Sequence, residues 1–367
     1  MVARPARVGI AGGGTGGHIE PALNLADEIR RRDPETSIVV FGTERGLEVE
    51  LVPDRGYELT LIPPVPLPRR INRDLFSLPR RLRDATSRAR EIIESAELDV
   101  VCGFGGYVSI PVYLAARRSK TPFVVHEANA KPGIANRVGA RLTKYVAENY
   151  AGSLSHAERL GCPLRVDISE LNRLERRSEA REFFGLTQEG PVLLAFGGSQ
   201  GAASINRAVW DSAQEVCDAG VQILHAVGAR QEDEGLAFRE RSPADYHPLT
   251  FIHRMDLAYA AADMALCRAG AMTCAEVAAV GLPAAYIPYP VGNGEQRFNA
   301  APVVAAGGGL IINDAELNCE VVLDQVLPLL MDPEAMLRMG LAAGGYGIRD
   351  GAARLTEMVS EAGESRE

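Results

Sequence analysis

The chain has 367 residues, of which 46% are hydrophobic, and its net charge is −9. Because domains usually hold about 100–200 residues, a chain of this length is expected to form two of them. The acidic balance argues against a general nucleic-acid-binding protein, and no apolar run approaches the about 20 residues that cross a bilayer as a helix.

Short apolar runs alternate with amphipathic stretches in the first half of the chain, which is typical of β-α-β units on a parallel sheet. The expected strands are 7–11, 37–41, 58–62, 99–102, 122–126 and 144–147. The expected helices are 21–31, 75–95, 110–118 and 134–142. The alternation breaks at 151–172, which is polar and irregular, so a boundary is expected there.

The second half begins the same alternation again. Its expected strands are 192–196, 222–226, 249–252, 264–267, 284–287 and 310–312. A glycine-rich turn follows the first strand of each half, at 13–17 and at 197–201. We therefore expect an α/β protein with two Rossmann-like doubly wound domains facing each other across a cleft, at 1–165 and 166–345. A C-terminal helix near 346–362 could pack back on the first domain.

Gly12, Gly14 and Gly17 in the first turn match the G-x-G-x-x-G pattern of dinucleotide-binding proteins. Such a site also needs an acidic residue about 20 residues further on, whereas Glu44 lies 27 residues beyond Gly17. His18 follows the glycines at once and has no role in binding a dinucleotide. An NAD site is therefore disfavoured, and the pattern alone indicates only a tight turn before a helix.

The segment 267–288 is a better candidate for a nucleotide site. It reads as a strand, a turn of small residues and a helix that opens at 271–273, where backbone N–H groups can bind a diphosphate. Glu276 lies one turn further, where a carboxylate could accept both ribose hydroxyls. Glu295 and Gln296 follow the next strand and suit sugar hydroxyls. The alternative is an ordinary β-α unit in which Glu276 only favours the start of the helix.

Six segments in order along the chain resemble the MurG-type family, the N-acetylglucosaminyltransferases that convert lipid I to lipid II in peptidoglycan synthesis. They are 12–23, 103–111, 126–137, 197–206, 267–284 and 292–300. Their sequences are most similar to those of actinobacterial members. The resemblance implies the GT-B fold, with the donor bound mainly by the second domain and no cofactor. It also implies roles in cell wall biogenesis, cell shape, cell division and the cell cycle.

The resemblance implies two sets of binding residues. The expected UDP-GlcNAc contacts are Thr15, Gly16, Gly17, Asn129, Arg165, Ser199, Ile252, Ala271, Met272, Thr273, Cys274, Ala275, Glu276 and Gln296. Among these, Ile252 and Arg165 would lie at the uracil. The expected contacts to lipid I, the polyprenyl-linked acceptor, are His18, Gly105, Gly106, Tyr107 and His126.

The transfer needs a base that takes a proton from the acceptor hydroxyl as that hydroxyl attacks the anomeric carbon. His18 is the first candidate, because an unperturbed imidazole has a pKa of about 6.5, and Glu127 is the second. His18 could instead only bind the acceptor, and Glu127 could instead only fix its loop. The chain holds no D-x-D triplet and no zinc-like cysteine spacing, so no metal is expected.

The segment 63–90 holds eight arginines against two aspartates. Apolar Leu75, Phe76, Leu78 and Leu82 interleave with them, as in a helix that lies on an anionic bilayer. This pattern predicts peripheral docking on the cytoplasmic face of the cell membrane, and the alternative is a solvated helix face.

Two positions depart from the family pattern. Cys162 replaces the usual asparagine, and Glu295 replaces the first of two glutamines. Three alternatives therefore stay open: a secondary-metabolite glycosyltransferase, a UDP-GlcNAc 2-epimerase, and a non-catalytic scaffold that binds nucleotide-sugar.

Overall fold

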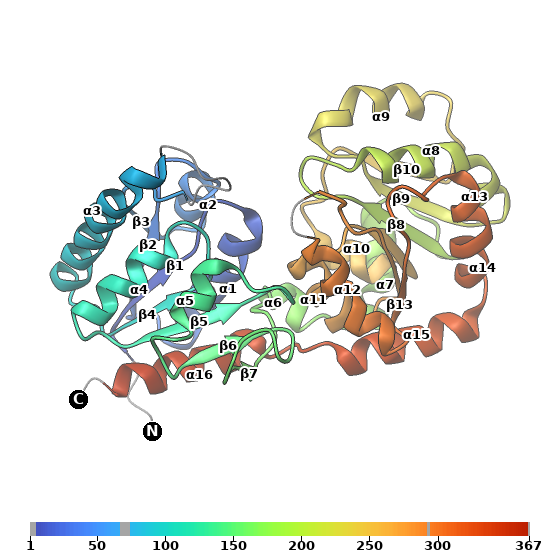
Figure 1. Ribbon diagram of the computed structural model, residues 1–367. Coiled ribbons are helices and arrows are strands. Elements are labelled where there is room, and N and C mark those ends of the chain that lie inside the picture. Colours follow the sequence, from blue (N-terminus) through green and yellow to red (C-terminus); the bar gives the residue numbers. More distant parts are fainter. Residues whose placement is uncertain (1–4, 67–73, 292–293, 366–367) are drawn as a thin grey trace. The chain divides into compact units, whose positions relative to one another are not determined.

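The computed structural model describes residues 5–66, 74–291 and 294–365. Contacts between residues divide the chain into two compact units (Figure 1). The first unit consists of Met1–Arg165 together with Asp350–Glu367, and the second is Val166–Arg349. Each unit is built around one parallel sheet, so the predicted pair of Rossmann-like α/β domains is confirmed.

The first unit has a seven-stranded parallel sheet in the order β3-β2-β1-β4-β5-β6-β7. Its strands are β1 (Arg7–Ala11), β2 (Ser37–Gly42), β3 (Glu58–Leu61), β4 (Val100–Gly103), β5 (Phe123–Glu127), β6 (Val146–Glu148) and β7 (Glu158–Arg159). The inner strands are apolar on both faces, as expected for a parallel sheet covered on both sides.

Helices cover both faces of this sheet. One face packs against α1 (Gly16–Arg32), α2 (Glu48–Asp54) and the C-terminal α16 (Gly351–Glu364). The other face packs against α3 (Asp74–Ser95) and α4 (Ser109–Arg118), with α5 (Ile134–Gly139) beside α4. The last helix of the chain thus completes the core of the first unit.

The second unit has a six-stranded parallel sheet in the order β10-β9-β8-β11-β12-β13. Its strands are β8 (Val192–Phe196), β9 (Gln222–Ala226), β10 (Tyr246–Leu249), β11 (Met264–Cys267), β12 (Ala284–Tyr286) and β13 (Gly309–Ile311). Its helical elements are α6 (Val166–Ser169), α7 (Arg173–Phe183), α8 (Ala203–Asp218), η1 (Ala229–Gln231), α9 (Glu232–Arg239), α10 (Met255–Ala261), α11 (Ala271–Ala279), α12 (Glu295–Ala305), α13 (Cys319–Val321), η2 (Val322–Val326), α14 (Leu327–Leu330) and α15 (Pro333–Tyr346).

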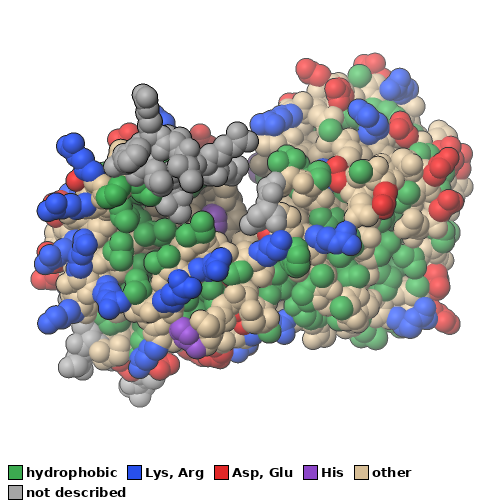
Figure 2. Space-filling view, viewed as in Figure 1, with side chains coloured by type: hydrophobic (Ala, Val, Ile, Leu, Met, Phe, Trp, Pro, Cys, Tyr) green, Lys and Arg blue, Asp and Glu red, His purple; other side chains and the backbone are tan. Residues whose placement is uncertain are grey.

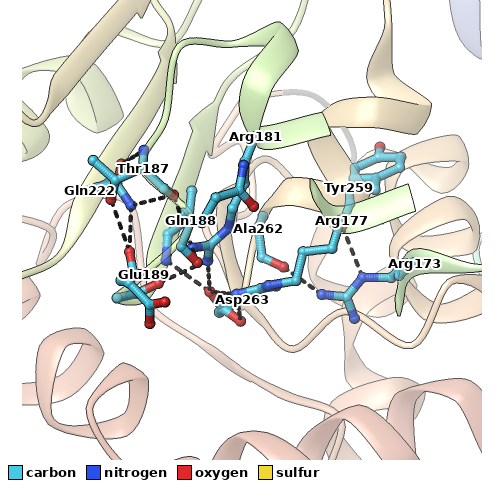
Figure 3. A network of polar contacts seen from close by, with 12 residues as sticks. Arg173, Arg177, Arg181, Thr187, Gln188, Glu189, Gln222, Tyr259, Ala262 and Asp263 are labelled. Atoms are coloured by element: carbon cyan, nitrogen blue, oxygen red, sulfur yellow. Dashed lines mark hydrogen bonds and ion pairs between the residues drawn. The ribbon is translucent and has the colours of Figure 1, made fainter. Parts of the chain in front are cut away.

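A buried polar network ties α7 to the two central strands of the second unit (Figure 3). Arg181 is 1% exposed and donates hydrogen bonds to three backbone carbonyls and to Asp263. Asp263 also accepts from the N–H of Val192 at the start of β8 and pairs with Arg177. The Asp263 carboxylate therefore balances the positive charge of both guanidinium groups. It also holds the start of β8 beside the start of β11.

In each sheet, the strands that follow the first strand along the chain add to one side of it, and the later strands add to its other side. The order of the strands therefore reverses beside the first strand of each unit. These switch points lie between β1 and β4 in the first unit and between β8 and β11 in the second. Ligands of doubly wound domains bind at the carboxyl ends of the strands at such points. Both glycine turns, at 12–17 and 197–201, follow the strand that forms a switch point.

Four strands have the predicted bounds, β1, β8, β9 and β11, whereas other elements differ. β10 lies three residues before the predicted 249–252. α1 begins at Gly16 rather than at Pro21, because the N–H groups of His18 and Ile19 already bond to the carbonyl of Thr15. The segment 151–172 contains the edge strand β7 and the short helix α6.

Candidate active site

The first switch point brings the 12–17 turn beside the loop after β4. Gly14 and Gly106 adopt φ values of +88° and +79°, which disfavour any side chain. A Cβ atom on Gly106 would lie 2.4 Å from the carbonyl oxygen of Gly13. Glycine is therefore required at 106 for the two loops to meet.

His18 lies in the first turn of α1 at this meeting point. Its Nδ1 atom is 3.2 Å from the Thr15 hydroxyl, and its Nε2 edge faces Gly105, where a Cβ atom would lie 3.3 Å away. Burial lowers the pKa of His18, and a hydrogen bond with the Gly13 carbonyl opposes that effect. The ring is therefore neutral at neutral pH and can accept a proton.

The loop after β4 presents Tyr107 to solvent. The side chain of Tyr107 is 47% exposed, and the preceding turn is fixed because the Ser109 hydroxyl accepts from the Gly105 N–H at 3.0 Å. Gly105, Gly106, Tyr107 and His18 therefore lie together at the first switch point.

Glu127 ends β5 and is 2% exposed. Its carboxylate accepts from the N–H groups of Asn129 and Gly133 at 2.9 and 3.0 Å, and from the side-chain amides of Asn136 and Asn129 at 3.0 and 3.3 Å. Burial raises the pKa of Glu127, and these hydrogen bonds oppose the rise. The contacts favour a loop-fixing role over proton transfer.

His126 is fully buried, and its Nε2 atom lies 2.8 Å from the carbonyl oxygen of Gly161. Burial lowers the pKa of His126 to about 4. These contacts favour a packing role, and acceptor binding by His126 stays a prediction.

The second switch point forms a pocket of about 940 Å³. The predicted donor residues Ser199, Thr273 and Gln296 line it together, and so do three arginines that were not predicted, Arg207, Arg230 and Arg268. Arg207 lies in α8 and Arg230 lies in η1, and neither belongs to one of the six predicted segments. Arg268, however, directly follows β11, a position from which it could have been predicted.

Arg268 is anchored by its neighbours. Its guanidinium group pairs with Asp314 and donates to the Ser204 hydroxyl at 3.0 Å. It also lies 5.4 Å from the centre of the Tyr289 ring. The Arg268 guanidinium group is therefore held in a fixed position at the carboxyl end of β11, paired with Asp314, which also lines the pocket.

Gln296 is the second residue of α12 and lines the pocket. Its side-chain oxygen accepts from the N–H groups of Ala269 and Tyr289 at 3.1 and 2.9 Å. Since the oxygen is fixed by two donors, the amide nitrogen is the end that can donate to a ligand.

The other predicted donor residues are spread more widely. Glu276 accepts from the Tyr259 hydroxyl at 2.8 Å, and Ala271 and Cys274 are buried, while Met272 and Ala275 are half-buried. Ile252 is buried and lines a separate pocket after β10. Thr15, Gly16, Gly17, Asn129 and Arg165 belong to the first unit.

Solved structures define the class of protein. The crystal structure of MurG from Acinetobacter baumannii matches 97% of this chain and all of its own chain, with a TM-score of 0.80 and 27% identity. The calicheamicin glycosyltransferase CalG4 and the UDP-GlcNAc 2-epimerase from Neisseria meningitidis match with TM-scores of 0.67 and 0.66, at 18% and 13% identity, and show the fold alone. The chain has the two-Rossmann-domain GT-B fold, as predicted.

Sequence comparisons give the family. The N-terminal and C-terminal domain models of glycosyltransferase family 28 match residues 8–148 and 192–355. Relatives from Acidothermus cellulolyticus and Streptomyces collinus are 53% and 54% identical over 97% of this chain and cover 98% and 99% of their own length. Both are named UDP-N-acetylglucosamine–N-acetylmuramyl-(pentapeptide) pyrophosphoryl-undecaprenol N-acetylglucosamine transferase. This chain therefore belongs to the MurG-type glycosyltransferases of family 28, and it is an enzyme.

The predicted resemblance to actinobacterial members is thereby confirmed. The departure at Cys162 lies in the core, since the side chain is 1% exposed. A Cβ atom on Gly351 would lie 2.6 Å from the Cys162 carbonyl oxygen, so this segment packs closely against the start of α16.

Proposed function

We propose that the enzyme transfers N-acetylglucosamine from UDP-GlcNAc, with inversion, to the 4-hydroxyl of the N-acetylmuramyl group of lipid I, forming lipid II. The observation that carries this proposal is the identity of about 53% with relatives named for this transfer, over nearly the whole chain. The alternative activities, a secondary-metabolite transferase or a 2-epimerase, correspond only to structures that share the fold at low identity.

The pocket of the second unit suits the donor diphosphate. Arg230 and Arg268 bring positive charge to it, and Thr273 lies in the first turn of α11, where backbone N–H groups favour an anion. These groups would stabilise the charge that develops on the leaving UDP. The amide nitrogen of Gln296 would bind a sugar hydroxyl.

The remaining donor contacts rest on the resemblance. Glu276 would accept from the ribose hydroxyls, in place of or beside the Tyr259 hydroxyl that it binds in this structure. Ile252 and Arg165 would contact the uracil. The contacts assigned to Thr15, Gly16, Gly17 and Asn129 stay predictions, as do those of Ser199, Ala271, Met272, Cys274 and Ala275.

The first switch point suits the acceptor and the proton transfer. The acceptor oxygen would form a bond to the anomeric carbon while the bond from that carbon to the phosphate oxygen breaks and UDP leaves. The proton of the hydroxyl would pass to the neutral ring of His18 and from there to solvent. Tyr107 would contact the acceptor from the neighbouring loop.

The basic helix α3 would dock the enzyme on the anionic cytoplasmic leaflet that carries lipid I. Part of the predicted segment, residues 67–73 and the side chains of Leu75 and Phe76, lies outside the described residues. Figure 2 shows Lys and Arg side chains along the edge formed by α3, beside apolar surface over α4 and α5. The exposed arginines of α3 include Arg80, 89% exposed. Among the described residues, no helix is long and apolar enough to cross a bilayer.

Vesicle sedimentation tests the docking proposal. The enzyme should pellet with vesicles that contain anionic lipid more than with neutral vesicles, and added salt should reduce the difference because exposed charges are screened. Equal binding to both kinds of vesicle would remove the role of α3.

A transfer assay tests the activity. Radiolabelled UDP-GlcNAc and a short-chain lipid I analogue are incubated with the enzyme, and label is followed into the lipid phase. Incorporation supports the proposed reaction, donor and acceptor together. Binding of UDP-GlcNAc without any transfer would instead favour a non-catalytic scaffold.

A further inference from the structure

The pocket of the second unit contains a carboxylate among its arginines. Arg207, Arg230 and Arg268 line this pocket, and Asp314 is the one acidic side chain among the described residues that line it. Asp314 follows β13 and Arg268 follows β11, so both come from the carboxyl ends of strands in one parallel sheet. The pocket that is proposed to receive a diphosphate therefore has a negative group built into its wall.

Asp314 is held by two donors that also contact each other. Its Oδ1 atom accepts from Nη1 of Arg268 and from the Ser204 hydroxyl, both at 2.5 Å. The Ser204 hydroxyl in turn accepts from Nη2 of Arg268 at 3.0 Å. The carboxylate cannot turn away from the guanidinium group without losing both contacts, so its charge has a fixed position in the pocket.

The ion pair is largely shielded from solvent. The side chain of Arg268 is 13% exposed and that of Asp314 is 19% exposed, whereas Arg207 and Arg230 are exposed. Water and salt screen exposed charges much more than partly buried ones. Asp314 therefore offsets the positive charge that solvent screens least, while the two exposed arginines keep the balance of the pocket positive.

Arg268 keeps two donors for a ligand beside this carboxylate. Its Nη1 atom bonds to Asp314 and to the carbonyl oxygen of Ile287, and its Nη2 atom bonds to Ser204. Since a guanidinium group has five N–H donors, the Nε–H and one Nη2–H remain without a partner among the described residues. These two N–H groups form one of the forks that bind a phosphate through parallel hydrogen bonds. A diphosphate can therefore bind Arg268 while Asp314 stays in place close to it.

We propose that Asp314 repels the diphosphate in this pocket and so favours the release of UDP after transfer. The proposal rests on the proposed function, in which this pocket binds the diphosphate of UDP-GlcNAc. Transfer breaks the bond between the anomeric carbon and the phosphate oxygen, and a terminal phosphate loses its second proton near pH 6. The product UDP is therefore more negative than the donor above that pH, and the fixed carboxylate repels the product more strongly.

Calorimetric titration of UDP and of UDP-GlcNAc at pH 7.5 tests the proposal. Asp314→Asn keeps the shape of the side chain and an oxygen that can accept from Arg268, and it removes the charge. The affinity for UDP should increase about fivefold or more, and the affinity for UDP-GlcNAc should increase less, because repulsion grows with the charge of the ligand. In the transfer assay, inhibition by added UDP should strengthen by the same factor as its affinity.

Asp218→Asn is the matched control. Asp218 is exposed at the far end of α8, 14 residues after Ser204, which corresponds to about 20 Å along a helix. This variant removes the same charge, and both affinities should stay within about 1.5-fold of the wild-type values. Asp314→Ser, whose hydroxyl can also accept from Arg268, repeats the measurement if thermal unfolding shows that Asp314→Asn does not fold.

The opposite sign separates this proposal from a purely structural role. If Asp314 only positioned Arg268, its replacement would weaken UDP binding, and that result would overturn the proposal. An equal change for both ligands, or no change, would also overturn it. Arg268→Ala tests the proposed function separately: if UDP bound this variant as tightly as the wild-type enzyme, the diphosphate would lie elsewhere and the proposed donor site would fail as well.

Discussion

The two switch points of this enzyme have the same kind of turn in opposite electrostatic surroundings. Both have a parallel strand, a glycine-rich turn and a helix, but the first turn has its Gly14 N–H occupied by the buried carboxylate of Glu48. The second turn opens on a pocket lined by Arg207, Arg230 and Arg268. The same glycine pattern therefore has a carboxylate beside it in one unit and arginines beside it in the other, which favours an anion at the second turn.

The largest effect that tests this contrast is expected at His18. His18→Ala should lower kcat by about 10²–10⁴-fold, the usual contribution of a general base. It should leave the affinity for UDP-GlcNAc within about twofold, because the nucleotide is proposed to bind at the second turn. Steady-state transfer kinetics and calorimetric binding measure the two quantities. An equal loss in both would remove His18 as the base.

Acid should weaken both units through their buried histidines. Burial lowers the pKa of His126 in the first unit to about 4 and that of His225 in the second to about 3. Unfolded histidine titrates near 6.5, so the unfolded chain binds more protons below that pH and stability falls as pH falls from about 6.5 to 4. At pH 5 each ring should cost about 2 kcal/mol relative to pH 7.5.

Urea unfolding at the two pH values measures this loss. His225→Gln keeps a polar side chain near its partners Tyr246 and Asn206 and cannot be protonated in this range. This variant should reduce the pH dependence of the free energy of unfolding of the second unit. A pH dependence unchanged in this variant would contradict the assignment.

Specificity for the sugar should depend on Gln296. Gln296→Glu keeps the oxygen that binds the N–H groups of Ala269 and Tyr289 and removes the amide donor. Loss of one hydrogen bond to a buried polar group costs about 1–3 kcal/mol, so affinity for UDP-GlcNAc should fall about 5–100-fold. The affinity of the same variant for UDP should fall less than its affinity for UDP-GlcNAc. Parallel calorimetric titrations compare the two ligands, and equal losses would place Gln296 away from the sugar.

The smallest effects are expected from substitutions at the N-terminal ends of two helices, α15 and α1. Asp332 caps α15 by accepting from two backbone N–H groups, whereas Thr15 at the start of α1 makes no such contact and faces His18 instead. Asp332→Ala should cost about 1 kcal/mol of stability and no activity. Thr15→Ala should cost less stability but reduce kcat. Thermal unfolding and the transfer assay separate these cases, and the reverse pattern would show that Thr15 is a structural cap.

Local patterns were sufficient to predict the two-domain fold. β1, β8 and β11 are short apolar runs bounded by turns, and a parallel sheet buries such runs on both faces. β7 was missed because its two residues, Glu158 and Arg159, pair at the edge of the sheet without any apolar alternation. Pairing at an edge depends on tertiary contacts rather than on local sequence.

The site was predicted only in part for the same reason. His18 and Gln296 stand beside glycine or strand signals, so their positions could be predicted. Glu48 could not, because its role depends on the approach of α2 to the β1 turn across 34 residues. His126 and Glu127 begin the predicted segment 126–137, but their burial depends on tertiary packing, which a short sequence pattern does not indicate.

The most direct test of the contrast between the turns is a calorimetric titration of UDP-GlcNAc into wild-type enzyme, Arg268→Ala and Glu48→Gln, with Arg297→Ala as a control outside the pocket. The account predicts one site per chain, weakened about 10-fold or more in Arg268→Ala and unchanged in Glu48→Gln and Arg297→Ala. Weakening in Glu48→Gln with none in Arg268→Ala would place the nucleotide at the first turn and contradict the account.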